Sequence, residues 1–163
     1  MSQSIPPRVT AALFLSVVLL SVLPGCTKRI NASDENKYYK TLTEVLISLP
    51  ASKQREFDDG MAMIWFYSES KEATYAKIHG KSGRELLEMI AEMKASLPRL
   101  DTSSGEAYED SLAKIRAGLP PSQIKTYDMW RKELPSYRQG NPKLDALNGL
   151  TFQEIIEKRD SAK

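Results

Sequence analysis

The chain has 163 residues, with 23 basic and 21 acidic side chains, one cysteine and one histidine. This length corresponds to one compact domain or two small ones. A single cysteine cannot form an intramolecular disulfide, and one cysteine with one histidine cannot supply the three or four ligands typical of a zinc site. The charges alternate in sign along the chain, unlike the clustered basic faces that bind nucleic acid. Composition therefore predicts a protein stabilised by packing, with no disulfide, no metal and no nucleic acid partner.

The start of the chain contains an apolar segment. Residues 9–22 carry no charge and follow a polar lead with one arginine, which is typical of a secretory signal peptide. The segment is shorter than the roughly 20 apolar residues that a membrane-spanning helix needs. It ends in Leu23, Pro24, Gly25 and Cys26. This ending resembles the lipobox of bacterial lipoproteins, in which the cysteine is lipidated and the peptide before it is removed.

The lipobox resemblance predicts a lipoprotein signal peptide over residues 1–25 and a lipid-anchored tether over residues 26–32. Thr27 follows the cysteine where some lipoproteins of double-membrane bacteria have aspartate. By resemblance to their sorting, this implies the outer membrane, with the protein facing the periplasm. Lys28 and Arg29 in the tether either contact anionic headgroups or are simply solvated. An ordinary signal peptide with an unrelated cysteine, and a single membrane anchor, are the alternatives.

The rest of the chain contains an internal repeat. At an offset of 70 residues, residues 30–58 align with residues 100–128, and apolar and proline positions keep their places. After a one-residue deletion, residues 79–88 align with residues 148–157. Chance similarity rarely preserves both the apolar pattern and the turn residues over such a span. We therefore predict two copies of one unit, at 33–98 and 99–163.

Each copy is expected to form three helices. The first has a stripe of apolar residues at positions 38, 42, 45 and 49, repeated at 108, 112, 115 and 119, with Ser33 and Ser103 as expected N-caps. The second helix is expected over about 52–77 and 123–138. The third follows Gly80 and Gly149 and starts with an S/T-x-x-E capping box, at residues 82–85 and 151–154.

The fold class predicted from these patterns is all-α. Two tandem three-helix units are expected to pack as one six-helix domain behind a cleaved lipoprotein signal peptide. Residues 61–67 (MAMIWFY) are apolar on nearly all sides, as in a helix buried on most faces. The second unit has few apolar residues in its last helix. We therefore expect the 61–67 helix to provide the surface against which the second unit packs.

Three motifs carry a resemblance to a known family. They are an I-D-x-S-S start, an S-L-x-x-I-x-x-x-L-P helix end and an N-G-x-T-x-x-E-I-I final helix, matched most closely by residues 100–119 and 148–157. This unit resembles a family of small proteobacterial lipoproteins known only as a domain of unknown function, and the resemblance implies two tandem copies of that domain. Asn31 replaces the acid of the first motif, and residues 79–82 vary the start of the last. The resemblance implies no catalytic residues.

The most prominent candidates for a partner contact are large aromatic side chains. Trp65, Phe66 and Tyr67 could form such a contact, and so could Trp130 with Tyr137, although aromatic residues at helical spacing more often belong to a core. His79 precedes a glycine at a helix boundary and has no second histidine nearby in the sequence. A turn position is therefore expected for His79 in preference to a general base. We assign no catalytic residue and no cofactor.

Three classes of function remain compatible with the sequence. The favoured one is a non-catalytic helical interaction module in the cell envelope, anchored to the membrane by lipid and contacting another envelope protein or itself. A periplasmic inhibitor or immunity protein against a toxin or hydrolase is an alternative. A small enzyme or ligand carrier with a cavity between helices is another. Fold alone does not distinguish them, and the sequence leaves the oligomeric state open.

Overall fold

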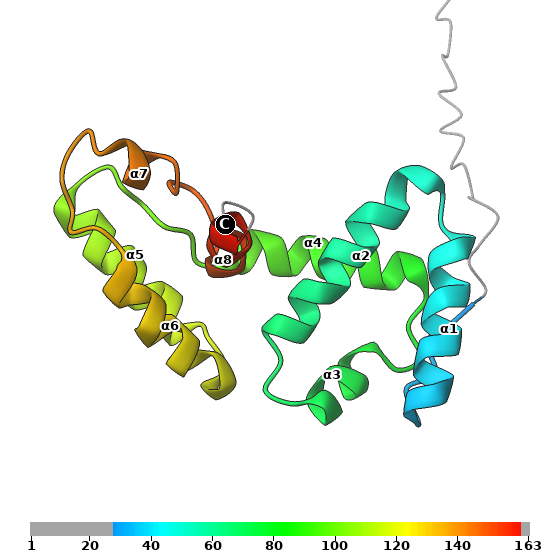
Figure 1. Ribbon diagram of the computed structural model, residues 1–163. Helices are drawn as coiled ribbons and strands as arrows, with labels where there is room; N and C mark the ends of the chain where they lie inside the picture. Colours follow the sequence, from blue (N-terminus) through cyan, green and yellow to red (C-terminus); the bar gives the residue numbers. More distant parts are fainter. Residues whose placement is uncertain (1–27, 161–163) are drawn as a thin grey trace, which may run out of the picture.

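The computed structural model describes residues 28–160, which form an all-α fold (Figure 1). The predicted signal peptide, including Leu23, Pro24 and Gly25, and the predicted lipidation site Cys26 lie outside the described residues. The described part has eight helices and two isolated β-bridges. The helices are α1 (Glu35–Ser48), α2 (Ala51–Phe66), α3 (Lys71–Ile78), α4 (Gly83–Ser96), α5 (Gly105–Ala117), α6 (Pro121–Glu133), α7 (Pro142–Asp145) and α8 (Phe152–Asp160).

The first four helices surround one hydrophobic core. Its fully buried members include Val45 of α1, Phe57 and Ile64 of α2, and Leu86 and Ile90 of α4. Gly60 allows α2 and α4 to approach closely, since a Cβ atom at this position would collide with the side chain of Ile90. The apolar stripe predicted for the first helix therefore does face a core.

The last four helices enclose a second core. Tyr108, Leu112 and Ile115 of α5 take the places that Tyr38, Leu42 and Val45 have in α1. The second core also contains a cluster of three rings, in which Trp130 and Tyr127 lie 5.2 and 5.4 Å from Phe152 between ring centroids. The second unit thus compensates for its short apolar stripes with large aromatic side chains.

The predicted number of helices is wrong, because each unit has four helices where three were expected. The helix expected over residues 52–77 ends at Phe66, and α3 starts after Ser70, whose hydroxyl accepts a hydrogen bond from the Ala73 amide. In the second unit, Leu134 ends α6 in an extended conformation just before Pro135, and Asn141 caps the short α7. Serine and asparagine caps, together with proline, interrupt apolar patterns that continue across the breaks.

The expected N-caps are also displaced by one residue. Asp34 and Ser104, not Ser33 and Ser103, cap α1 and α5. The amides of Ser33 and Ser103 instead donate hydrogen bonds to the side chains of Asn31 and Asp101, two residues upstream. These local turns hold the chain extended for one more residue. By contrast, both predicted capping boxes, Ser82 with Glu85 and Thr151 with Glu154, are confirmed.

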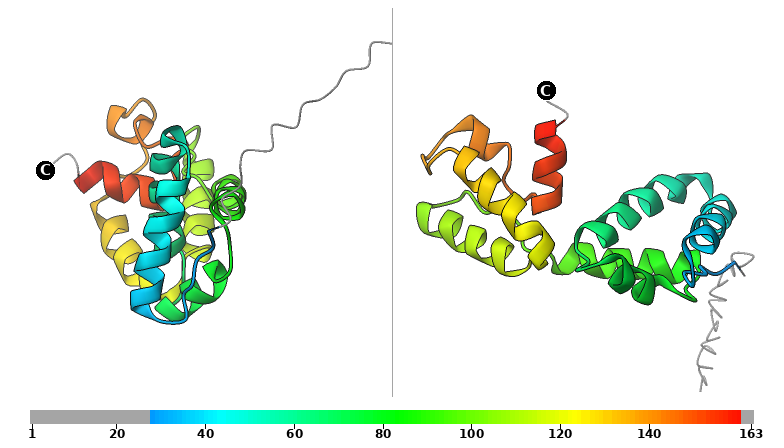
Figure 2. Two further views of the ribbon diagram at one scale, coloured as in Figure 1. Left: turned by 90° about the vertical axis from the view of Figure 1, so that its right-hand side faces the viewer. Right: turned by 60° about the horizontal axis from the view of Figure 1, so that its bottom comes forward.

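The two cores meet where α2 ends. The ring of Phe66 lies 5.9 Å from that of Phe152 in α8, and Tyr67 packs against both cores. The backbone N–H of Gln153 also points at the Tyr67 hydroxyl, with the nitrogen 3.5 Å from the oxygen. The right-hand view in Figure 2 shows α4 extending from α1 toward the second unit. The end of the 61–67 segment therefore does contact the second unit, whereas Trp65 packs within the first.

We expect the two units to unfold together because they share this contact. Trp65→Ala should destabilise the protein by about 3 kcal/mol, the lower end for loss of a large aromatic, since Trp65 is only partly buried. Trp130 is then the remaining tryptophan and reports on the second unit. In urea, the unfolding midpoints of the Trp65→Ala variant, followed by Trp130 fluorescence and by far-UV circular dichroism, should both move to lower urea than those of a Trp65→Phe control. If the urea midpoint reported by Trp130 did not move, the two units would unfold independently of each other.

Candidate functional site

The first described residues are attached to the loop before α4. Arg29 forms an antiparallel bridge with Ser82, the Ile30 amide donates to the Lys81 carbonyl at 2.9 Å, and the Gly80 amide donates to the Ile30 carbonyl at 2.8 Å. The Ile30 side chain is 1% exposed. We call this arrangement of residues 29–32 and 79–82 the N-terminal clasp.

The same clasp occurs in the second unit. Arg99 bridges Thr151, the Leu100 amide donates to the Leu150 carbonyl at 2.9 Å, and the Gly149 amide donates to the Leu100 carbonyl at 2.8 Å. Gly80 and Gly149 both have φ of 75°, a conformation that glycine adopts without strain. The positions matched by the sequence repeat therefore make matching contacts.

His79 lies at the end of α3, as expected for a turn residue. Its Nδ1 atom accepts a hydrogen bond from the Ala32 amide at 3.0 Å. In the second clasp the Oδ1 atom of Asn148 accepts from the Thr102 amide at 2.9 Å. These two acceptor atoms occupy the same place on their side chains, so His79 and Asn148 have the same structural role.

A charged pair covers the outside of the first clasp. Arg29 donates to the Gly80 carbonyl and lies 3.0 Å from a carboxylate oxygen of Glu85. Glu85 also accepts hydrogen bonds from the amide and hydroxyl of Ser82, which together with Arg29 lower the pKa of its carboxyl to about 2. Glu85 is thus ionised at neutral pH and holds the start of α4 in place.

The clasp changes the expected boundary between tether and fold. Residues 26–32 were predicted to form a tether, but Ile30 and Ala32 are buried against the first core. The Asn31 amide is also bonded to the Thr41 hydroxyl of α1 at 2.8 Å. Residues 29–32 therefore belong to the first unit, and an anchor at Cys26 would be joined to it almost directly.

Three of the aromatic residues considered for a partner contact, Trp65, Trp130 and Tyr137, lie in different places. Trp130 is 3% exposed and belongs to the second core. Trp65 is partly buried and donates a hydrogen bond from Nε1 to the Tyr38 hydroxyl at 3.0 Å. Tyr137 is partly buried beside Tyr108, with 5.9 Å between ring centroids. The structure does not bring these residues together on one surface.

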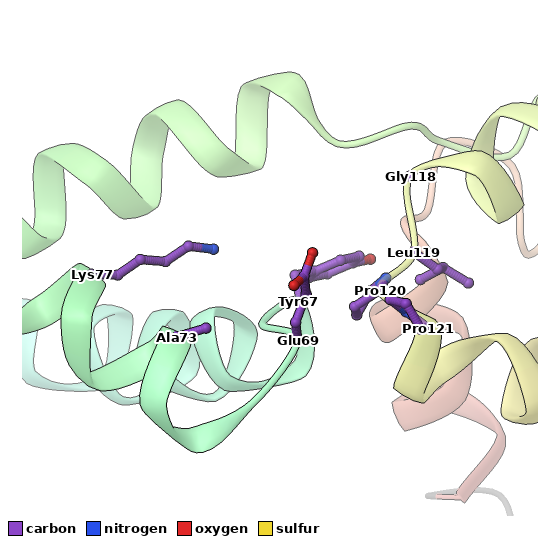
Figure 3. Close-up of a pocket in the computed structure, with 8 residues that line it drawn as sticks. All are labelled: Tyr67, Glu69, Ala73, Lys77, Gly118, Leu119, Pro120 and Pro121. Carbon is purple, nitrogen blue, oxygen red and sulfur yellow. The ribbon is translucent and has the colours of Figure 1, made fainter.

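A shallow pocket of about 280 Å³ lies between the two units. Its walls are α3 and the residues before it on one side, and the α5–α6 turn on the other (Figure 3). Glu69 and Lys77 are its charged residues, and burial raises the pKa of the Tyr67 hydroxyl, which is therefore neutral at physiological pH. The volume is at the low end for small-molecule sites. No nucleophile with an adjacent base lines this pocket.

A second hollow of about 250 Å³ lies between α2, α4 and α8. Its charged residues are mixed in sign: Arg55 and Lys94 face Asp59, Glu154 and Glu157. Within residues 28–160, no group of three or more His, Cys, Asp or Glu side chains is arranged to hold a metal ion. None of the helices in this range is both long enough and apolar enough to span a bilayer.

The contact between the units is formed by Phe66 and Tyr67, two of the aromatics considered for a partner contact, and by Phe152, which was not considered for one. Phe66 and Tyr67 were assigned to a continuous helix, and Phe152 to the stripe of the last helix. The repeat itself contains a signal: Phe66 aligns with Ser136, and Phe152 with Gly83. Large apolar residues that replace small ones at matched positions indicate contacts specific to one unit.

No protein-family model, no curated protein and no solved structure matches this chain.

The repeat provides a matched test of the clasp. His79→Ala removes the acceptor for the Ala32 amide and should lower the free energy of unfolding by about 1 kcal/mol. His79→Asn supplies an equivalent acceptor, as Asn148 does in the second unit, and should stay within about 0.5 kcal/mol of the wild type. Urea unfolding measures both. Equal losses in the two variants would contradict the assigned role of the Nδ1 acceptor.

Proposed function

We propose that this chain is a lipid-anchored protein of the bacterial cell envelope that works as a non-catalytic interaction module. The observation that carries the proposal is the lipobox-like sequence Leu23-Pro24-Gly25-Cys26 after a charge-free apolar segment. A cleaved signal peptide and a lipidated Cys26 follow from it. The residue after the cysteine, Thr27, supports sorting to the outer membrane, with the folded units in the periplasm.

The described units are consistent with a role based on contact. The largest side chains are used mainly for packing, with Tyr108, Phe57 and Phe152 at most 1% exposed. The two pockets are shallow and lined by charges of both signs. These features favour an interaction surface, with another envelope protein as partner, over a reaction centre.

Lipidation can be tested at the cysteine itself. Cys26→Ser should abolish incorporation of radiolabelled palmitate and release the protein from membranes or leave it unprocessed, because no other thiol is present in the chain. Ser21→Ala, which alters the apolar segment without touching the cysteine, is the control. Full processing and membrane retention of the Cys26→Ser variant would exclude a lipid anchor at Cys26.

The interaction role needs a test of its own. Crosslinking in intact cells followed by affinity capture should yield one dominant envelope protein, at a yield well above that from an unrelated lipoprotein. Surface substitutions in the second unit that preserve the melting temperature should reduce the captured amount. Recovery of no protein above the control would contradict an interaction module.

A further inference from the structure

The covalent chain places an anchor at Cys26 very close to one end of the first unit. Three peptide links separate Cys26 from Arg29, so their Cα atoms lie within about 11 Å of each other in any conformation. Arg29 is fixed to the start of α4 by its bridge to Ser82. A membrane that holds Cys26 must therefore lie beside this end of the unit.

Five basic residues lie on the three segments that meet at this end of the first unit. Lys28 and Arg29 precede the first helix, Lys40 lies on α1, and Lys81 and Arg84 lie at the start of α4. The Nζ atom of Lys28 lies 2.9 Å from a carboxylate oxygen of Glu44 on α1. The hydrogen bond from Lys28 and the positive charges of Lys28 and Lys40 all lower the pKa of Glu44. Arg84 is 82% exposed and only loosely paired with Glu88, at 3.6 Å.

An exposed apolar side chain lies on the same side of α1 as Glu44 and Lys40. Ile47 is 70% exposed and lies one helical turn from Glu44, the partner of Lys28. An isoleucine so open to water gains little packing energy from its own unit. Basic and apolar side chains together are typical of surfaces that rest on a membrane. We call Lys28, Arg29, Lys40, Ile47, Lys81 and Arg84 the anchor-side face.

The second unit provides an internal comparison. At the positions of Lys28, Lys40, Lys81 and Arg84 it has Pro98, Asp110, Leu150 and Gln153. One exchange runs the other way, since Lys114 takes the place of Glu44. The backbone N–H of Gln153 faces the Tyr67 hydroxyl of the first unit, so this end of the second unit packs on protein. Arg99 keeps the charge of Arg29, and Ala117 takes the place of Ile47, so most of the positive charge and the large apolar side chain are specific to the unit beside the proposed anchor.

We propose that the anchor-side face binds the anionic phospholipid headgroups of the membrane that holds Cys26. Lys28 and Arg29, two and three residues from Cys26, lie within about a Debye length of the lipid surface, where attraction to anionic lipid is least screened. Ile47 enters the boundary between headgroups and acyl chains. The second unit is then directed away from the lipid, toward envelope partners. This inference builds on the proposed lipid anchor but uses different residues.

Sedimentation with vesicles tests the proposal without the anchor. Residues 27–163, which retain both units, are mixed with vesicles of phosphatidylcholine alone or with an added ~50% phosphatidylglycerol, and the membrane-bound fraction is measured against lipid concentration. Binding should favour the anionic vesicles and fall as salt is raised. Lys81→Gln with Arg84→Gln should weaken it between about fivefold and 25-fold, since each basic residue contributes about fivefold.

Matched variants on the second unit control for loss of charge and of apolar surface. Lys125→Gln with Lys132→Gln removes the same charge from α6 and should change binding less than about twofold. Ile47→Gln should weaken binding, whereas Met129→Gln, at a residue 53% exposed on α6, should not. Because Ile47→Gln changes α1 and not the start of α4, it tests the membrane contact even if the Lys81 and Arg84 substitutions disturb α4.

Three outcomes overturn the proposal: equal binding to neutral and anionic vesicles, no binding, or equal losses from the matched pairs of variants. If the variants of the anchor-side face lost a dimer in analytical ultracentrifugation but still bound vesicles, this face would be assigned to contact with a second copy of the chain. None of these results bears on lipidation, which the Cys26→Ser experiment decides separately.

Discussion

Burial of one residue near the start of each unit, Ile30 or Leu100, holds the unit together. Each is 1% exposed and bonded on both its amide and its carbonyl to the turn before the last helix. Backbone groups in a buried position are costly unless they are hydrogen-bonded. The pairing of this residue with the turn therefore fixes the first segment against the last helix, and the helices between them close around the core.

The repeat shows how one fold accepts different packing at a single position. Gly83 begins α4 beneath α1, where an added Cβ would lie 3.0 Å from Leu49 and 3.1 Å from Val45. Phe152 occupies the matched position in α8, fills the second core and reaches Phe66 of the first unit. The small residue draws two helices together within one unit. The large residue separates them and joins the two units.

Helices and turns could be predicted where the residues act locally. The capping boxes at Ser82 and Thr151 and the glycines before them depend on neighbours within three residues, and these were predicted correctly. The break after Phe66 was missed because the apolar pattern continues to Tyr75, while the serine that caps α3 gives only a weak signal. Burial of Ile30 was missed because its partners lie some 50 residues further along the chain.

The candidate surfaces could be predicted only in part. Trp130 and Tyr137 appear in the sequence as aromatic residues at helical spacing, which does not distinguish a core position from a surface one. The contact between Tyr67 and Gln153 joins residues 86 positions apart, and no local pattern encodes it. Comparison of matched positions in the two copies indicates such contacts better than either copy alone, because both share the packing rules of one fold.

The short connection between the units has a mechanical consequence. Only Leu97 and Pro98 lie between α4 and Arg99, and Arg99 donates a hydrogen bond back to the Lys94 carbonyl at 3.3 Å. A pulling force applied at the N-terminal side enters the first clasp and passes directly into α4. From there it reaches the second clasp with no slack segment to absorb it. The backbone hydrogen bonds of Ile30 and Leu100 thus lie one after the other on the path of a force that pulls on the N-terminal side of the molecule.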